Sequence, residues 1–535
     1  MDQQAPTQHS PGRGVLRSIA SGLLACATAL GVGELFGGLR ASWQSPVVGV
    51  AEATIDHVPR SVKDFGIRTF GQNDKFALVV GILVFSVLFA VLLGIVARRS
   101  LVAAAAGFAL FAAIGMWASQ QLVGSGVSGV VPSIAAGAAG IGTLWWLHRA
   151  PHTDSGTDTR PDEVVVSTDV DDVPTMAGFG GAGSRRRFLA SSGVFALAAA
   201  ATAAGGRALR TRFSASKSRD GVVLPAPATP LATAPAGVSA NAPGVSTFYT
   251  PNAKFYRVDT ALAVPQVAAE SWSLKVTGMV DHEIEIDYAD LLGRDLVEED
   301  ITLTCVSNTV GGNLLGTARW LGLPIQTLLD EAGVHPDADQ LVGRSVDGYT
   351  CGFPIASLDG RPALIAVGMN GEPLPIAHGF PARLMVAGLY GYVSATKWVT
   401  ELEVTRFDKF DQYWVDRGWD QEAPIKISAR IDTPRTLAKV PAGTTVIGGV
   451  AWAQTKGISK VEVAIDGDDF QEATLADELT VNTWRQWTLP WDAPAGRHRI
   501  TVRATDGDGV LQTEDRADPF PNGASGWMSI FVDVT

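Results

Sequence analysis

Cysteine and charged residues are scarce in this chain of 535 residues, and each scarcity excludes a class of protein. Only three cysteines occur, too few for an extracellular scaffold held by disulfides, although Cys305 and Cys351 are available for one bridge. Charged residues make up 18% and hydrophobic residues 46%, so the chain is too apolar on average for a wholly soluble protein. The net charge of -12 and the lack of a basic groove pattern predict no nucleic-acid partner.

The motifs of the common redox cofactors are also missing. The sequence has no Cys-x-x-Cys-His haem motif, no Rossmann fingerprint placed between a strand and a helix, and no iron–sulfur spacing. His57 and His148 flank the long apolar segments, so these segments offer no pair of buried histidines for haem. We therefore expect neither haem nor a nicotinamide cofactor.

Long apolar segments are concentrated before residue 205. Residues 76–97, 101–118 and 123–147 approach or reach the roughly 20 residues that cross a bilayer, and residues 16–39 form a weaker fourth segment. These segments predict a membrane domain over residues 1–150 with four transmembrane helices. Glu34 lies near the end of the first segment, where we expect a carboxylate at the membrane interface rather than in a proton path.

A basic cluster precedes a fifth apolar segment. Residues 184–189 read Ser-Arg-Arg-Arg-Phe-Leu, and the apolar run at 190–204 follows them. This combination resembles a twin-arginine signal, which is read by machinery that exports folded proteins. The alternative is that the arginines are the positive flank of an ordinary membrane helix. Either interpretation predicts a transmembrane helix over residues 184–206, and the signal further implies a cofactor inserted before export.

The basic residues also predict the topology. Positive charge precedes the first apolar segment and follows the second and fourth, as the positive-inside rule expects of cytoplasmic loops. These residues are Arg13, Arg17, Arg98, Arg99, Arg149 and the cluster at 185–187. We therefore expect a multi-pass protein of the cytoplasmic membrane, with a cytoplasmic linker at 151–183. Residues 207–246 are expected to form an Ala/Pro-rich tether to an extracytoplasmic catalytic domain.

Cys305 ends a segment with strand character. Residues 301–305 alternate between apolar and polar, the next four residues are mostly polar, and Gly311 and Gly312 follow. A thiolate at a strand end beside a loop is well placed to bind a soft metal. The alternative is a buried structural thiol, which is the commoner role of a free cysteine.

Four further segments carry a family resemblance. They are Thr-Ala-Arg-Trp at 317–320, a stretch at 371–383 that ends in His-Gly-Phe-Pro-Ala-Arg, Gly-Tyr-Val-Ser-Ala-Thr-Lys-Trp at 391–398 and Leu-Glu-Val at 402–404. In order and spacing, residues 248–407 resemble the sulfite oxidase family of molybdenum enzymes. The resemblance implies an α+β molybdopterin-binding domain over residues 247–410.

The resemblance also implies site residues. Cys305 is expected to ligate molybdenum, and Tyr349 and Arg257 are expected to act with it in catalysis. The expected cofactor-binding residues are Tyr256, Arg257, Cys305, Asn308, His378, Arg383, Ala395, Thr396 and Lys397. The chemistry agrees, because the cofactor brings a dithiolene and a phosphate, which require a thiolate for the metal and cationic donors for the anion.

Two departures from the family concern the substrate. Sulfite oxidases carry a pair of arginines shortly after the cysteine, where this chain has Thr309 and Val310, and a further arginine that is missing from residues 521–525. Without these cations a buried dianion is poorly compensated, unless Arg257 and Arg319 rebuild the site. We expect oxygen-atom transfer on a small sulfur- or nitrogen-containing molecule other than sulfite. The alternatives are an S-oxide reductase of the methionine-sulfoxide type and a cofactor-free, membrane-anchored binding or sensor module.

Residues 423–535 have the pattern of an all-β domain. Alternating segments at 460–465, 484–489 and 497–502 are separated by Asp/Gly turns, which predicts an immunoglobulin-like sandwich. The segment resembles the family's dimerisation domain and implies a homodimer. The whole chain is thus expected to be multi-domain, with a helical membrane region, the α+β domain and the sandwich. Since no second redox centre is built in, a separate cytochrome or quinone-linked protein is expected to carry electrons.

Overall fold

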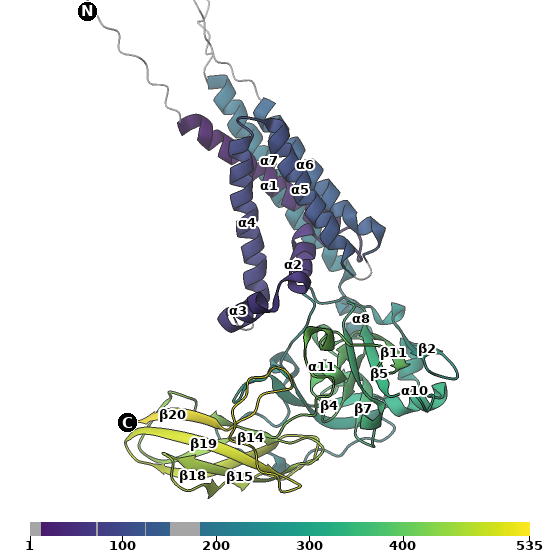
Figure 1. Ribbon diagram of the computed structural model, residues 1–535, viewed down its shortest axis with the longest axis vertical. Coiled ribbons are helices and arrows are strands. Elements are labelled where there is room, and N and C mark those ends of the chain that lie inside the picture. Colours follow the sequence, from purple (N-terminus) through teal and green to yellow (C-terminus); the bar gives the residue numbers. More distant parts are fainter. Residues whose placement is uncertain (1–11, 71–72, 123–124, 150–181) are drawn as a thin grey trace, which may run out of the picture. The chain divides into compact units, whose positions relative to one another are not determined.

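The computed structural model describes residues 12–70, 73–122, 125–149 and 182–535 (Figure 1). The chain divides into two compact units, Met1–Phe213 and Ser214–Thr535, called unit 1 and unit 2 here. Nearly all of the expected linker at 151–183 lies outside the described residues.

Unit 1 is helical throughout most of its described length. Its helices are α1 (Gly12–Gly37), α2 (Pro46–His57), α3 (Arg60–Phe70), α4 (Asp74–Val96), α5 (Leu101–Gln120), α6 (Val131–Arg149) and α7 (Ala182–Arg210). Five helical segments are long and apolar enough to cross a membrane, namely Gly14–Gly37, Asp74–Val96, Leu101–Gln120, Val127–Arg149 and Phe188–Gly221. The helices expected at the five apolar segments are therefore confirmed as helices of membrane-spanning length.

The short helices α2 and α3 have no counterpart in the sequence-based expectation. The Oγ of Ser45 accepts a hydrogen bond from the backbone N–H of Val48 at 3.4 Å, and Pro46 occupies the first turn of α2. A serine cap followed by proline is a typical helix start, so a local signal for α2 was present.

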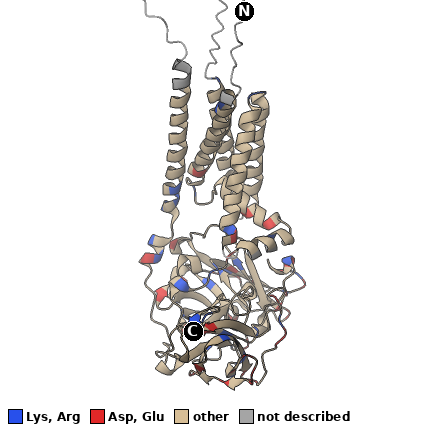
Figure 2. Ribbon diagram, turned by 90° about the vertical axis from the view of Figure 1, so that its left-hand side faces the viewer, with Lys and Arg blue, Asp and Glu red and all other residues tan. Residues whose placement is uncertain are grey.

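Helix α1 packs closely against its neighbours in unit 1. A Cβ on Gly22 would collide with the backbone of Ala90 and Gly94 in α4, so glycine permits the two helices to approach. By contrast, α4 exposes large apolar side chains, with Phe76 72% and Leu88 63% exposed. Figure 2 shows the long helices uncharged over most of their length, which suits a lipid environment.

The first part of unit 2 is an α+β domain built on two sheets. One sheet has the order β2-β1-β11-β5-β6, and the other has the order β10-β9-β7-β4-β3, with β8 paired to β7. The first sheet comprises β1 (Ser273–Gly278), β2 (Ile284–Asp287), β5 (Gln340–Ser345), β6 (Thr350–Pro354) and β11 (Val399–Thr405). The second comprises β3 (Val297–Thr304), β4 (Leu315–Pro324), β7 (Ala363–Met369), β8 (Glu372–Pro373), β9 (Arg383–Val386) and β10 (Thr396–Lys397).

The helices of this domain are short, and a single core lies between its elements. They are α8 (Ser216–Gly221), α9 (Tyr288–Leu292), α10 (Ile325–Ala332) and α11 (Gly391–Ser394). Trp320, Phe353 and Phe380 are fully buried in this core. The core fixes the ends of β3, β9 and β10, which carry Cys305, Arg383 and Lys397 at or beside their termini.

The C-terminal domain contains two sheets that share a second apolar core. The sheets have the orders β12-β14-β18-β17 and β13-β20-β19-β15-β16. Trp487 from the first sheet and Val502 from the second are both fully buried in this core. The strands are β12 (Ser428–Thr433), β13 (Lys439–Val440), β14 (Gly443–Trp452), β15 (Ile458–Ile465), β16 (Gln471–Glu472), β17 (Thr474–Leu475), β18 (Arg485–Ala493), β19 (Gly496–Asp506) and β20 (Met528–Val534). The three strands expected from alternation correspond to β15, β18 and β19.

The stretch expected to be a tether is in large part packed against unit 2. The backbone N–H of Ala228 donates to Leu296 O at 2.7 Å, and that of Ala240 donates to Gln486 Oε1 at 2.7 Å. Val238 is buried in one cluster with Trp452 and Trp484. Apolar and backbone contacts thus hold a segment whose Ala/Pro composition by itself suggested a free linker.

The C-terminal domain also braces the strand that leads to Cys305. The side chain of Gln454 donates to Thr302 O at 3.1 Å, and the backbone N–H of Trp484 donates to Thr302 Oγ1 at 2.8 Å. Arg430 donates to Gly312 O at 3.0 Å, which holds the loop after the cysteine.

Candidate active site

Cys305 lies at the end of β3, in a tight loop that returns to β4. Its backbone N–H donates to Leu314 O at 2.9 Å, and its carbonyl accepts from the N–H of Asn308 at 3.0 Å. Asn308 in turn accepts from Leu314 N through its Oδ1 at 2.8 Å, so its side chain closes the loop. Asn308 therefore positions the loop that carries Cys305, and its expected contact with the cofactor stays a prediction.

The thiol of Cys305 is available for a ligand. It is only 9% exposed, and burial raises its pKa, so it is protonated at neutral pH unless a cation displaces the proton. All three cysteines are free, and the bridge considered between Cys305 and Cys351 is not formed. Cys351 instead accepts a hydrogen bond from Thr396 Oγ1 at 3.0 Å.

A cavity of about 120 Å³ opens beside Cys305. Six of the expected site residues line it: Tyr256, Cys305, Tyr349, Arg383, Ala395 and Lys397. The rest of the lining includes Phe255, Asp259, Ser307, Asp347, Tyr392, Trp414 and Trp419. The tertiary structure thus brings together side chains from segments up to about 160 positions apart, as the resemblance implied.

Four expected residues lie outside this lining: Arg257, Asn308, His378 and Thr396. His378 is nevertheless in contact with the site, since its carbonyl accepts from Arg383 Nη1 at 3.3 Å and its ring stands edge-on to Phe255, with 5.6 Å between ring centroids. Thr396 is turned toward Cys351 and Gly343 O.

Two buried polar atoms in this region are left without a hydrogen-bond partner among the described residues. They are Nδ1 of His378 and Nε of Arg383, in side chains that belong to residues only 5% and 4% exposed. Buried polar groups are nearly always bonded in native proteins, so such atoms point to a missing polar ligand. A cationic donor and an imidazole beside a thiol fit a group that carries both a soft metal and an anion.

Electrostatics at these residues follow from burial. Desolvation lowers the pKa of His378 to about 4, and the charges of Arg383 and Lys397 act in the same direction, so the imidazole is neutral at pH 7. Burial likewise lowers the pKa of Lys397 to about 8, although Asp259 opposes the shift. Lys397 therefore keeps most of its positive charge at neutral pH.

Asp259 is a site residue that the sequence did not reveal. Its side chain is 3% exposed, and it forms ion pairs with both Lys397 and Arg257. Burial by itself raises the pKa of Asp259, but the two cations outweigh it and lower the pKa below its usual value. An acidic residue two positions after Arg257 was the only local signal. Arg257, expected to act in catalysis and to hold the cofactor, is committed to this carboxylate.

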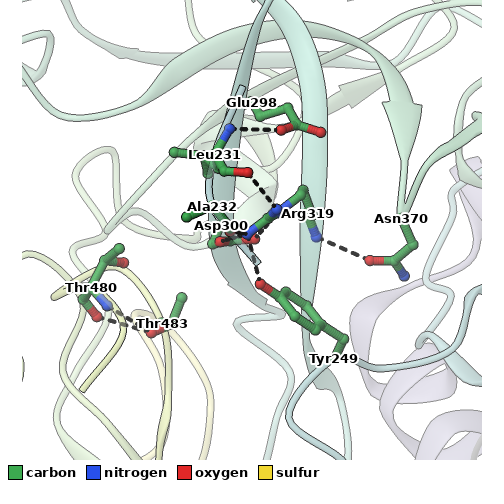
Figure 3. A network of polar contacts seen from close by, with 9 residues as sticks. All are labelled: Leu231, Ala232, Tyr249, Glu298, Asp300, Arg319, Asn370, Thr480 and Thr483. Atoms are coloured by element: carbon green, nitrogen blue, oxygen red, sulfur yellow. Dashed lines mark hydrogen bonds and ion pairs between the residues drawn. The ribbon is translucent and has the colours of Figure 1, made fainter. Parts of the chain in front are cut away.

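Arg319 is also occupied, in the network of Figure 3. Its Nε and Nη2 donate to the two oxygens of Asp300 at 3.0 and 2.8 Å, and Nη2 also donates to Tyr249 Oη at 3.2 Å. Further bonds reach the carbonyls of Leu231 and Ala232 at 3.3 and 2.9 Å. Arg319 therefore fastens the 225–243 stretch to β3 and β4, and the idea that it rebuilds an anion site is not supported by its contacts.

A cysteine thiol at a strand end, with buried cationic and imidazole groups that have unmet hydrogen-bonding capacity, fits a molybdopterin-binding oxidoreductase domain. Residues 261–414 match the family described as the oxidoreductase molybdopterin binding domain. These residues therefore form a domain of this family, and about half of the chain is similar in sequence to sulfite oxidases, which are molybdopterin-dependent oxidoreductases.

Two relatives and one solved structure show what the chain is similar to. Mitochondrial sulfite oxidase from Macaca fascicularis is 27% identical over 328 residues, which is 51% of this chain and 59% of that protein. The uncharacterized oxidoreductase YuiH from Bacillus subtilis is 29% identical over 148 residues, covering 28% of this chain and 72% of YuiH. Among solved structures, the sulfane dehydrogenase SoxCD from Paracoccus pantotrophus is 20% identical, with 54% of this chain and 82% of that chain covered and a TM-score of 0.49.

Proposed function

We propose that this chain is a membrane-anchored molybdopterin-dependent oxidoreductase that transfers an oxygen atom to or from a small sulfur- or nitrogen-containing molecule outside the cytoplasmic membrane. The observation that carries the proposal is the meeting of Cys305, Arg383 and Lys397 on one cavity. The chain spans 59% of the length of the Macaca fascicularis sulfite oxidase. We therefore infer the activity and the substrate from this site rather than from that relative.

Each residue of the site has a role that suits the cofactor. Cys305 would ligate molybdenum once its thiol has lost the proton that burial favours. Arg383 and Lys397 would hold the phosphate, and neutral His378 would bond the pterin ring through the nitrogen that has no protein partner. When bound, the molybdenum cofactor supplies two-electron redox chemistry with transfer of an oxygen atom.

The chain's own residues hold the reacting region in place. Tyr349 is fixed by the bond that its hydroxyl donates to Tyr392 O at 2.9 Å, and burial raises its pKa well above the usual value. The phenol therefore stays protonated and does not act as a base at neutral pH. We assign Tyr349 to shaping the substrate side of the cavity rather than to proton transfer.

In the proposed reaction, water is the source or the destination of the transferred oxygen atom. In the oxidative direction the substrate gains the oxygen of one water and releases two protons and two electrons. The reverse direction consumes the same protons and electrons and releases water. Since the sequence contains no second redox motif, a separate cytochrome or quinone-linked protein is proposed to carry the electrons one at a time.

The membrane location is proposed from the helices and their flanks. Five helices of spanning length, with basic residues on alternate flanks, support a multi-pass protein whose N-terminus is cytoplasmic and whose unit 2 is extracytoplasmic. A twin-arginine signal at 184–189 fits this orientation, because a folded domain loaded with cofactor requires that route. The immunoglobulin-like topology of the C-terminal domain, and homodimerisation through it, remain part of the same proposal.

Metal analysis and a substrate panel test the function. Purified full-length protein from a molybdenum-sufficient host is expected to contain about one molybdenum and one pterin per chain. Turnover is measured with sulfite, S-oxides and N-oxides, using artificial one-electron donors and acceptors. Protein that is folded but free of molybdenum and pterin would instead support the cofactor-free binding or sensor module. Turnover only in the reductive direction would support the S-oxide reductase.

A further inference from the structure

The lining of the cavity is rich in aromatic rings. Tyr349, Tyr392, Trp414 and Trp419 all line the cavity, and we call these four residues the aromatic wall. Trp414 contacts Trp419 with 6.1 Å between ring centroids, and Tyr392 contacts Trp419 at 5.6 Å. Tyr392, Trp414 and Trp419 therefore pack on one another, and Tyr349 is joined to them by the hydrogen bond that its hydroxyl donates to Tyr392 O.

Two further rings support the wall from behind. Tyr413 lies 5.7 Å from Tyr349 and 5.1 Å from Trp414 between ring centroids. Phe520 of the C-terminal domain stands edge-on to Trp419 at 5.4 Å. The same C-terminal loop binds the chain next to Trp419, since Asn522 donates to Asp420 at 2.6 Å. This loop includes the segment in which sulfite oxidases place an arginine, and here it supplies a ring and an amide instead.

The hydroxyl groups of the wall are already used by backbone carbonyls. Tyr349 Oη donates to Tyr392 O at 2.9 Å, and Tyr392 Oη donates to Asp420 O at 2.6 Å. A phenol has a single proton to donate. The wall therefore presents ring surface to the cavity and offers no phenolic proton to an oxyanion.

The charges around the cavity also disfavour an anion. The described lining residues include two acidic side chains, Asp259 and Asp347, and two basic ones, Arg383 and Lys397. Lys397 is paired with Asp259, and both Lys397 and Arg383 are assigned to the cofactor phosphate. Arg417 stacks on Tyr413, 3.5 Å from the ring centroid, and donates to its carbonyl at 2.7 Å, outside the lining.

We propose that the aromatic wall is the specificity-determining surface of the site, and that it selects an uncharged substrate bearing an apolar organic group over an inorganic oxyanion. This inference rests on the proposed function and deepens it. The apolar group packs on the wall and places the reacting sulfur or nitrogen toward Cys305. Burial of apolar area favours such a substrate, whereas an oxyanion placed on the wall loses its hydration and gains no hydrogen bond from the wall's phenols.

Steady-state kinetics on the purified, cofactor-loaded full chain tests this inference. Methyl phenyl sulfoxide with reduced viologen, or methyl phenyl sulfide with ferricyanide, is compared with the dimethyl compounds, with para-carboxylated analogues and with sulfite. The phenyl compound is expected to have a KM at least tenfold below that of the dimethyl compound. The added carboxylate is expected to raise the KM at least tenfold.

Variants of the wall separate recognition from chemistry. Trp419→Ala is expected to raise the KM of the phenyl compound at least tenfold, with kcat within twofold and little change for the dimethyl compound. Trp419→Phe should restore most of the loss. Phe520→Ala, at a ring that is 39% exposed and therefore tolerant of truncation, should give a smaller loss in the same direction. Trp527→Ala, in the C-terminal domain away from the wall, is the matched control.

The outcomes distinguish this inference from the function it rests on. Molybdenum content is measured for every variant, so a preparation without molybdenum overturns the proposed function itself. A loaded enzyme that saturates with micromolar sulfite, or in which Trp419→Ala lowers all substrates equally, overturns the role of the wall. An unchanged KM for the phenyl compound in both Trp419→Ala and Phe520→Ala overturns it as well.

Discussion

Asp259 and Lys397 form a buried ion pair on the cavity that Cys305 also lines. Desolvation lowers the pKa of Lys397 to about 8, and the carboxylate of Asp259 partly offsets this effect. Lys397 is one of the residues assigned to the cofactor phosphate. Lys397 carries a positive charge below that pH and loses it as the pH rises through about 8. The hold on an anion is therefore expected to weaken in alkaline solution.

Asp259→Asn tests this coupling. Removing the carboxylate while burial persists should lower the pKa of Lys397 further, so retention of the cofactor should be lost at a lower pH than in the wild type. The measurement is the molybdenum and pterin that remain bound after gel filtration across pH 6 to 10. Asp347→Asn removes another cavity carboxylate that is not paired with Lys397 and serves as the control. Identical midpoints in wild type and Asp259→Asn would contradict the prediction.

Cys305→Ser is expected to abolish turnover, because a hydroxyl is a poorer ligand for this metal than a thiolate. The variant should retain a larger fraction of its bound pterin than of its turnover, because Arg383, Lys397 and His378 are still present to hold the pterin. Turnover and bound pterin are measured on the same preparation. Cys351→Ser, at the other buried thiol of unit 2, is the control and should retain activity per molybdenum. Full activity in Cys305→Ser would remove the assignment of the metal ligand.

His378 should make apo-protein stability depend on pH. Its folded pKa of about 4 lies below the ordinary value of 6.5, so the unfolded state binds a proton that the folded state excludes as the pH falls from 6.5 to 4. Stability is thus present near pH 7 and declines on acidification, by about 2 kcal/mol at pH 5 for this group alone.

The measurement is urea unfolding of apo full-length protein at pH 7 and pH 5, in wild type and His378→Gln. Tryptophan fluorescence reports on unit 2, which holds ten of the 14 tryptophans. The variant, having no titrating imidazole at this position, should show a smaller decline than the wild type. An equal decline in the two proteins would show that His378 is solvated or paired in solution.

The paired arginines of the proposed export signal are tested by a charge-preserving change. Arg185→Lys with Arg186→Lys keeps the positive flank and should leave helix orientation unaffected, while blocking export of unit 2 by the twin-arginine route. Protease added outside spheroplasts should digest unit 2 in the wild type and spare it in the double variant. Arg207→Lys with Arg210→Lys, at the other end of α7, is the control. If protease digests unit 2 of the Arg185→Lys, Arg186→Lys variant as it does in the wild type, residues 184–189 are not an export signal and only flank a membrane anchor.

Local sequence determined the elements with strong periodicity or length. Apolar runs of about 20 residues satisfy their backbone internally only as helices, and α1, α4, α5, α6 and α7 follow. Alternation predicted β15, β18 and β19, because side chains of a strand point to opposite faces. The family resemblance also predicted that Cys305, Arg383 and Lys397 share one site, because proteins with the same fold bring the matching positions of their chains together.

Only the tertiary structure decided how the charges and rings of the site are used. Asp259 forms ion pairs with Arg257 and Lys397, and Arg319 forms one with Asp300. The ring of Trp419 contacts that of Phe520. The partners in these contacts are 2 to 138 positions apart in the sequence. Composition and periodicity report on each segment by itself and are silent about such partners. The Ala/Pro stretch at 225–243 shows the same limit, since its packing depends on backbone groups that the far strands offer. Sequence therefore determined which groups are present, and long-range packing determined which of them remain available for chemistry.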